Sequence, residues 1–331
     1  MLGCAVDRDE ERRLIAATTA FRDERVAVSW WCVLSTFVLL LLFGAAAALA
    51  PVAWPFRLAL GVATGLVFVR AFVLYHDYMH ESLLRGSILG AVLFRFFGLV
   101  AVTPPRVWAA THNYHHSHTG RIQGSHIGSY HLVTVEMWRS MTARARLAYR
   151  LTRHPLTILF GYLTAFVLGM CVSSFVRNPK RHWDSGLSLV VHVAASAAVW
   201  VFLGWQAYLF AWVTPFVVGS ATGAYLFYVQ HNFPDTRIPP HGQWTYAGSA
   251  LESSCYMRSG PFWEWITANI GYHHVHHLNP AIPFYRLPEA MAAVPELQHP
   301  PETTLWPRDI IAAFRQKLWD PAQNRMVGYP A

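Results

Sequence analysis

Five long apolar stretches alternate with polar segments along the 331-residue chain. They cover residues 28–49, 56–75, 157–176, 187–204 and 206–229. An α-helix rises about 1.5 Å per residue, so stretches of about 20 residues are long enough to cross the roughly 30 Å hydrocarbon layer of a bilayer. The pattern therefore predicts an all-α polytopic membrane protein.

Basic residues around residues 157–176 indicate that this stretch enters and leaves the membrane on the same side. Arg150 and Arg153 precede it, and Arg177 and Lys180 follow it. Short cytosolic loops carry the excess of Lys and Arg, which places both ends in the cytosol. We therefore expect a re-entrant helix here and four transmembrane helices elsewhere, with both termini on the cytosolic side.

Two further features complete the expected topology. The last two stretches are joined by the uncharged link Gly204–Gln206, which leaves room only for a tight turn, so they are expected to form an antiparallel hairpin. Residues 88–102 are apolar but carry Arg95 at their middle, and a charge at the bilayer centre is costly. This segment is predicted to be an interfacial helix.

Composition agrees with a membrane core that carries polar caps. Hydrophobic residues make up 54% of the chain and charged residues only 13%, which is more apolar than an average soluble domain. The net charge is +8, but Lys and Arg are not gathered into one tract with aromatic residues, so no nucleic-acid partner is expected. We expect a cytosolic N-terminal helix at 1–27, a membrane domain at 28–291 and a cytosolic C-terminal tail at 292–331, packed on a histidine-rich cytosolic cap.

Nine of the 18 histidines lie at the ends of the apolar stretches or in the polar segments between them, and eight of the nine follow a repeated spacing. They form one HxxxH cluster, two HxxHH clusters and a single histidine after the last stretch: His76 and His80, His112, His115 and His116, His273, His276 and His277, and His231. Helical positions three and four apart lie on one face, about 5–6 Å apart, so each cluster can aim its imidazoles at one point. A random chain of this composition would hold roughly 0.05 HxxHH matches, so two of them predict a metal site.

The three clusters read HDYMH, HNYHH and HHVHH, and they resemble the histidine boxes of the membrane fatty acid desaturase and hydroxylase superfamily. The stretch NIGYHHVHHLNPAIPFYRLPEA is similar to the third box of the acyl-lipid desaturase branch, as is QHNFPDT at Gln230. The resemblance extends from the first apolar stretch to about Met291. It implies two iron ions held by the eight box histidines, with His231 as a ninth ligand.

The resemblance also implies a reaction, in which an O2-dependent enzyme introduces a double bond into a lipid-linked fatty acyl chain, with the active site at the cytosolic membrane face. An alkyl C–H bond is unactivated, so a side-chain acid or base alone does not remove its hydrogen, and the reaction needs a metal and O2. The sequence contains neither an HPGG-type haem-binding segment nor an iron–sulfur set of cysteines. Electrons are therefore expected from a separate carrier, ferredoxin-like or a haem protein.

Two alternative functions fit part of the pattern. A membrane di-iron hydroxylase or ketolase, acting on a lipid, alkane or carotenoid, would use the same site. A membrane metal transporter or metal sensor could also gather histidines at a membrane face. Transporters usually place polar ligands near the bilayer midplane, however, and the apolar stretches here are nearly free of them.

Several other residues are candidates for supporting roles, because a ligating imidazole normally donates its second ring N–H to a carboxylate or carbonyl. The candidates are Asp77, Glu81, Asp235, Glu252 and Glu264, with Asn113, Asn232 and Asn269 as amide alternatives. Four histidines lie near the boxes but off the pattern: His118, His126, His131 and His274. His192, inside an apolar stretch, is left out of the site because a core hydrogen bond explains it.

Overall fold

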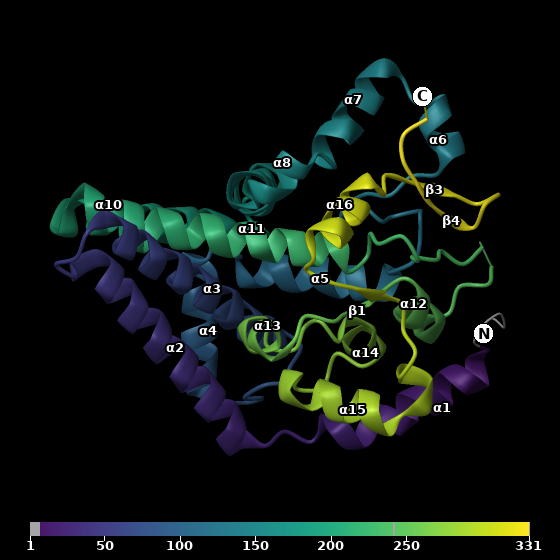
Figure 1. Ribbon diagram of the computed structural model, residues 1–331, viewed down its shortest axis with the longest axis horizontal. Helices are drawn as coiled ribbons and strands as arrows, with labels where there is room; N and C mark the ends of the chain where they lie inside the picture. The colour runs from purple at the N-terminus through teal and green to yellow at the C-terminus, as the bar shows by residue number, and fades with distance from the viewer. Residues whose placement is uncertain (1–6, 241, 331) are drawn as a thin grey trace. The chain divides into compact units, whose positions relative to one another are not determined.

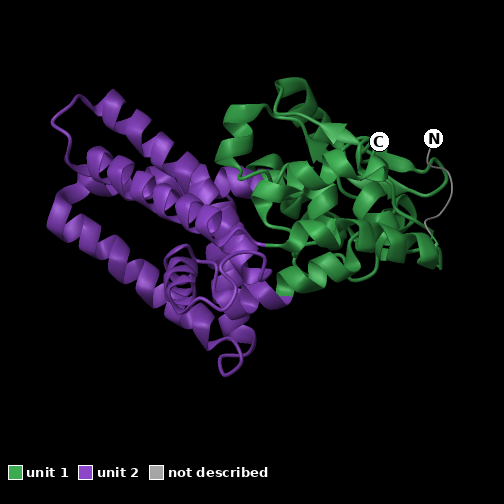
Figure 2. Ribbon diagram, turned by 90° about the horizontal axis from the view of Figure 1, so that it is seen from below, with its two compact units in different colours: residues 1–23, 111–157, 226–331 green, residues 24–110, 158–225 purple. Residues whose placement is uncertain are grey.

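The computed structural model describes residues 7–240 and 242–330, and these are mostly helical. The chain divides into two compact units, coloured separately in Figure 2. Unit 1 consists of Met1–Asp23, Thr111–Thr157 and Leu226–Ala331, and unit 2 of Glu24–Ala110 and Ile158–Tyr225. Each unit is therefore assembled from segments that lie far apart in the sequence.

Unit 2 contains long apolar helices. Helices α2 (Val26–Leu49) and α3 (Trp54–Met79) pack side by side (Figure 1). Both are long and apolar enough to cross a membrane. Large apolar side chains such as Leu41, which is 71% exposed, remain on the outer surface of α2. An apolar surface of this kind is compatible with lipid contact.

The third candidate span, Trp183–Val229, folds back on itself. It consists of α10 (Trp183–Tyr208), the π-helical η3 (Leu209–Val213) and α11 (Thr214–Val229). Gly204 interrupts the helix with φ 81° and ψ 171°. The rings of Trp200 and Tyr208 lie 5.0 Å apart, whereas eight residues of continuous helix would separate their Cα atoms by about 12 Å. The predicted turn at Gly204 is therefore confirmed.

The remaining helices of unit 2 are shorter. Helix α4 (Ile88–Val100) meets α5 (Pro105–His118) at a bend of 90°. The stretch predicted to be re-entrant forms α8 (Pro155–Leu159), the π-helical η2 (Tyr162–Ser173) and α9 (Ser174–Arg177). Its apolar helical part, Tyr162–Arg177, is shorter than the roughly 20 residues that a crossing needs.

His192 joins three elements of unit 2. Its Nδ1 donates to the carbonyl oxygen of Val100 at 2.8 Å, and its Nε2 accepts from the hydroxyl of Tyr162 at 2.6 Å. Both ring nitrogens are thus used in bonds from α10 to α4 and to η2. This supports the view that His192 has a structural role.

Unit 1 combines short helices with two small sheets. Apart from the parts of α5, α8 and α11 that it contains, its helices are α1 (Arg8–Thr18), η1 (Thr19–Arg22), α6 (Val135–Ser140), α7 (Ala143–Thr152), α12 (Tyr246–Glu252), α13 (Pro261–Ile266), α14 (His273–Leu278), η4 (Phe284–Arg286), α15 (Leu287–Ala293), η5 (Pro295–Leu297) and α16 (Pro307–Arg315). Strand β1 (Tyr256–Met257) pairs in parallel with β2 (Glu302–Thr303), and β3 (Leu318–Asp320) pairs antiparallel with β4 (Arg325–Val327). The all-α prediction missed these strands because two or three residues are too few to show an alternating pattern.

The N-terminal segment packs against the region around α14. Asp7 caps α1 by accepting hydrogen bonds from the first-turn amides of Asp9 and Glu10. At the other end of the helix, the hydroxyl of Thr18 accepts a hydrogen bond from Asn279, directly after α14, at 2.9 Å. Arg286 donates to the carbonyl oxygens at the end of the same segment. Hydrogen bonds therefore tie the N-terminal segment to the residues that follow α14.

Gly61 tests the close packing inside unit 2. A Cβ atom at this position would overlap with the backbone carbonyl oxygen of Phe210, whereas a Cβ at Gly44 would meet only Thr64 Cγ2 at 3.8 Å. We expect Gly61→Ala to lower the free energy of unfolding by about 1–3 kcal/mol, as overpacking does. Thermal unfolding in detergent measures this, with Gly44→Ala as a control that gains the same helix propensity. Equal stability of the two variants would contradict the packing described.

Candidate metal centre

Two short helical segments carry six of the predicted ligands in unit 1. His112, His115 and His116 lie on the C-terminal half of α5, and α14 carries the HHVHH box. All six side chains are buried, with exposures of 7% or less. His231 follows α11 by two residues and is half-buried.

Four of these histidines converge at one point and are called here the four-histidine group: His115, His231, His273 and His277. The Nε2 atom of His231 lies 3.0 Å from that of His115 and 2.9 Å from that of His273. The Nε2 atoms of His273 and His277 are 3.0 Å apart. Each imidazole therefore directs the same ring nitrogen toward the others.

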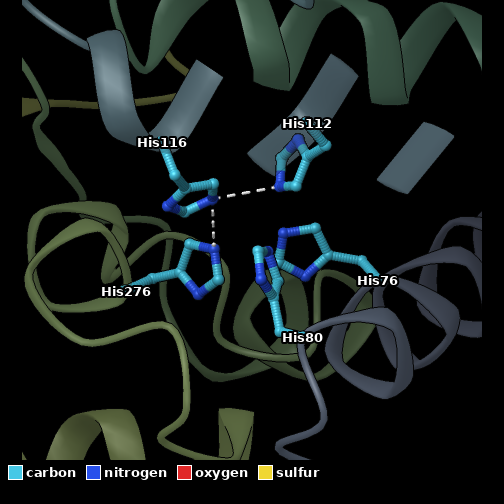
Figure 3. Close-up of side chains that lie close together, drawn as sticks. All are labelled: His76, His80, His112, His116 and His276. Atoms are coloured by element: carbon cyan, nitrogen blue, oxygen red, sulfur yellow. Dashed lines mark hydrogen bonds between the residues drawn. The ribbon is translucent and has the colours of Figure 1, made fainter. Parts of the chain in front are cut away.

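The other three form the three-histidine group of unit 1: His112, His116 and His276 (Figure 3). Nε2 of His116 lies 3.0 Å from Nε2 of His112 and 3.2 Å from Nε2 of His276. Each of the two HxxHH boxes thus contributes residues to both groups. The first and last histidines of one box join the middle histidine of the other, because positions four apart differ by only about 40° around a helix and positions three apart by about 60° in the opposite direction.

These distances fit metal coordination. Two imidazole nitrogens about 2.1 Å from one ion, at an angle of 90–110°, are about 3.0–3.4 Å apart. The Nε2 separations of 2.9–3.2 Å in both groups lie close to this range. Without a cation, several lone pairs would face one another in a buried site, which is electrostatically unfavourable. The donor set therefore suits a metal ion in each group.

The first box lies in unit 2, at the end of α3. The ring centroids of His76 and His80 lie 4.7 Å apart (Figure 3 shows the histidine pair). Both rings lie against the indole of Trp108, with centroid distances of 5.5 Å for His76 and 6.2 Å for His80. Nδ1 of His76 lies 3.0 Å from a carboxylate oxygen of Asp77. This contact supports the predicted role of Asp77 in orienting a box histidine.

Hydrogen bonds at Nδ1 fix the tautomers of two predicted ligands in unit 1. Nδ1 of His231 donates to the backbone carbonyl of Ser253 at 3.0 Å. The hydroxyl of Thr119 donates to the carbonyl of His115 at 2.8 Å, so it accepts from Nδ1 of His277 at 3.3 Å. With the proton held on Nδ1, the Nε2 lone pair of each imidazole is free for a metal.

Burial keeps these imidazoles neutral. It lowers the pKa of His231 to about 4, although the Ser253 carbonyl acts in the opposite direction. Burial, and then repulsion by the neighbouring His273 and His231, lowers the pKa of His277 well below its ordinary value. Neutral imidazole is the form that binds metal, so the ligands need not lose protons at neutral pH.

Three of the other predicted supporting residues have partners away from the box histidines. Glu81 is 3.6 Å from Arg85 at the surface, Glu264 accepts from Tyr256, and Asn269 donates to the carbonyl of Phe284. The contacts that the sequence did not predict come from Ser253 and Thr119. A backbone carbonyl leaves no signal in a sequence, whereas the spacing of four residues from His115 to Thr119 at a helix end was a usable sign.

The off-pattern histidines lie outside both groups. His274 is fully buried, but its Nε2 donates to the carbonyl of Leu297 at 3.1 Å. Burial lowers its pKa to about 4. His118 stacks on Tyr114 with ring centroids 3.8 Å apart, and the rings of His126 and His131 lie 5.7 Å apart. Among the described residues, none of the four shares a ligand cluster with the box histidines.

Arg153 has a role that its place in a basic segment did not predict. Its side chain is 1% exposed and donates to the carbonyl of His131 at 2.9 Å and to the side-chain oxygen of Asn232. Asn232 in turn donates to the carbonyl of Tyr228 at 2.8 Å. The arginine therefore holds the segment that contains His231.

Comparison with known proteins identifies the family. The family model for fatty acid desaturases matches residues 52–308, which is most of the chain. The chain belongs to the fatty acid desaturase family. The resemblance of the three boxes is thus confirmed, and this desaturase is an oxidoreductase.

The relatives of this desaturase include acyl-lipid enzymes. It is 30% identical over 281 residues to a fatty acid desaturase of Bacillus subtilis, covering 85% of this chain and 79% of the relative. It is 25% identical to the sn-1 oleoyl-lipid 12-desaturase of Synechocystis sp., covering 70% and 66%, respectively. The sn-1 acyl-lipid omega-3 desaturase (ferredoxin) of Nostoc sp. is 24% identical, with 76% and 72% covered.

The hydroxyl of Thr119 is expected to support metal binding through His277. Thr119→Val removes the acceptor for Nδ1 and keeps the shape of the side chain, so we expect metal affinity to fall about 10- to 100-fold, as for other outer contacts of metal sites. Equilibrium dialysis against a competing chelator measures this. Thr119→Ser keeps a hydroxyl and should restore affinity; equal losses in both variants would show that the hydrogen bond has no such role.

Proposed function

We propose that the protein uses O2 and a di-iron centre to introduce a double bond into a fatty acyl chain carried by a membrane lipid. The observation that carries this proposal is the convergence of seven Nε2 atoms of unit 1 into two groups. Membership of the desaturase family supplies the reaction class.

The proposed centre uses all nine predicted ligands. His115, His231, His273 and His277 would hold one ion, and His112, His116 and His276 would contribute to the second. We propose that His76 and His80 complete the second set. Two facts support this: a three-imidazole set leaves positions for further ligands, and the indole that His76 and His80 contact, Trp108, lies one turn before His112 on the same helix.

Iron is proposed over zinc because desaturation needs redox chemistry, which zinc lacks. When bound, the two ions would activate O2 for removal of hydrogen from two neighbouring carbons. The protein's own task is to hold neutral imidazoles in place and keep water out. The burial of α14 serves the second need, since all six of its residues are buried.

The proposed membrane topology is the one predicted from the sequence. Three apolar helical segments, one of them folded back at Gly204, supply four arms of suitable length for crossing, which we propose as the transmembrane helices. We propose that the centre and both termini face the cytosol, with the order 1–27, 28–291 and 292–331 as N-terminal helix, membrane domain and tail.

Electrons would come from a separate carrier, and one side of unit 1 suits their entry. The indole of Trp244 donates to the carbonyl of Thr119 at 2.8 Å, and the hydroxyl of Thr119 contacts His277. The exposed guanidinium of Arg121 lies over the same indole, 3.7 Å from its centroid. A positive, aromatic surface next to a proposed ligand suits an acidic carrier such as a ferredoxin-like protein, which agrees with the name of the Nostoc relative.

The family match favours this function over a metal transporter or sensor. A hydroxylase or ketolase differs from a desaturase only in the fate of the substrate after the first hydrogen is removed. The acyl-lipid desaturases among the relatives favour desaturation.

The proposal predicts a change in membrane lipids. Expression in a host with defined fatty acids should yield new unsaturated acyl chains, detected by gas chromatography. His276→Ala and His231→Ala should yield none, because each removes a ligand. His118→Ala is the matched control, since this ring stacks on Tyr114, and it should keep full activity. Hydroxylated products would support the hydroxylase alternative, and unchanged activity of His231→Ala would remove this residue from the centre.

A further inference from the structure

Unit 2 contains a cavity of about 340 Å³ where α4, α5 and the start of α10 meet. Much of its wall is apolar, with contributions from Leu99 and Leu187. Met79, the residue directly before the last histidine of the first box, also lines it. The cavity therefore reaches the end of the helix that carries His76 and His80.

A buried carboxylate lines the cavity. Asp184 is 3% exposed, and its Oδ2 accepts the backbone N–H of Arg106 at 2.8 Å, in the first turn of α5. This contact caps the helix and explains one oxygen. The other oxygen, Oδ1, is also buried but accepts no hydrogen bond from the part of the chain that the structure describes. A buried carboxylate oxygen without a donor is unfavourable, so Oδ1 indicates a ligand that offers an N–H or O–H group.

Two arginine residues line the same cavity. Arg95 and Arg106 both line it and are both exposed. The guanidinium carbon of Arg106 lies 6.0 Å from the ring centroid of Trp183, another lining residue. Arginine forks bind phosphate oxygens in pairs, so these two lining residues suit a phosphate.

We propose that this cavity binds the headgroup of a glycerophospholipid in which a hydroxyl or ammonium donor accompanies the phosphate. The phosphate binds Arg95 and Arg106, the donor bonds to Oδ1 of Asp184, and the apolar wall receives the first part of the acyl chains. This inference rests on the proposed function, because it identifies the bound lipid as the carrier of the acyl substrate. It also assigns a role to Arg95. The charge of this residue is the reason why α4 is predicted to be an interfacial helix, and in the proposed site the side chain binds the lipid phosphate.

Binding of three lipids with identical acyl chains tests the site. Phosphatidylglycerol offers hydroxyl donors, phosphatidylethanolamine offers N–H donors, and phosphatidylcholine has a phosphate but no N–H or O–H group. We expect native mass spectrometry of the purified protein to show one of the first two binding about tenfold more tightly than phosphatidylcholine, the effect of one hydrogen bond to a charged group. Whichever binds more tightly identifies the donor. Equal binding of all three would overturn the proposal.

Substitutions show which residues cause the lipid preference. Asp184→Asn keeps an acceptor for the Arg106 amide but places an NH2 group where Oδ1 stands, so the preference over phosphatidylcholine should disappear. Arg95 is exposed, so Arg95→Gln tests the phosphate contact without disturbing the cap of α5. This variant should bind all three lipids more weakly. Arg177→Gln, an exposed arginine outside the cavity, is the matched control. A preference that survives in Asp184→Asn would overturn the assignment.

The binding measurement is independent of turnover. It should give the same lipid preference in His276→Ala, which retains the cavity and lacks a metal ligand. Loss of preference with desaturation intact would reject the headgroup site alone. Desaturation absent in the unaltered protein with preference intact would reject the proposed function alone.

Discussion

Mutual approach of neutral imidazole nitrogens is the constraint on which the centre depends. In both groups of unit 1, Nε2 atoms lie 2.9–3.2 Å apart. A shared proton can satisfy one pair of nitrogens, but a divalent cation satisfies all the lone pairs of a group at once. The reciprocal exchange between α5 and α14 is compatible with this constraint, because each helix would supply two ligands to one ion and a third to the other.

The surrounding structure of unit 1 serves to keep these nitrogens in place. Ser253 and Thr119 hold the protons of His231 and His277 on the outer ring nitrogens. Arg153 secures Asn232, next to His231, and also bonds to the carbonyl of Gln316 near the C-terminal sheet. Ordering the centre therefore involves segments that are distant in the sequence, and metal binding is expected to be coupled to the folding of unit 1.

The sequence predicted which histidines gather better than it predicted their surroundings. The spacing of the HxxHH boxes follows from helix geometry, so it could be recognised without a structure, and the turn at Gly204 was predicted from the lack of charge and length in the link. The assignment of His115 and His276 to groups other than those of their box neighbours could not be predicted, because it depends on how α5 and α14 face each other. Arg153 was misjudged as an ordinary loop cation, since a buried arginine without a carboxylate partner in its sequence neighbourhood leaves no pattern.

The count of metal ions per chain tests the account most directly. Purified protein analysed by plasma mass spectrometry should contain two iron ions per chain, His273→Ala should lose the ion of the four-histidine group, and His116→Ala should lose the other. Each variant should therefore retain about one ion, and the double variant none, because the two groups share no ligand. A single ion in the unaltered protein, or full retention of both ions in either variant, would contradict the two-group arrangement.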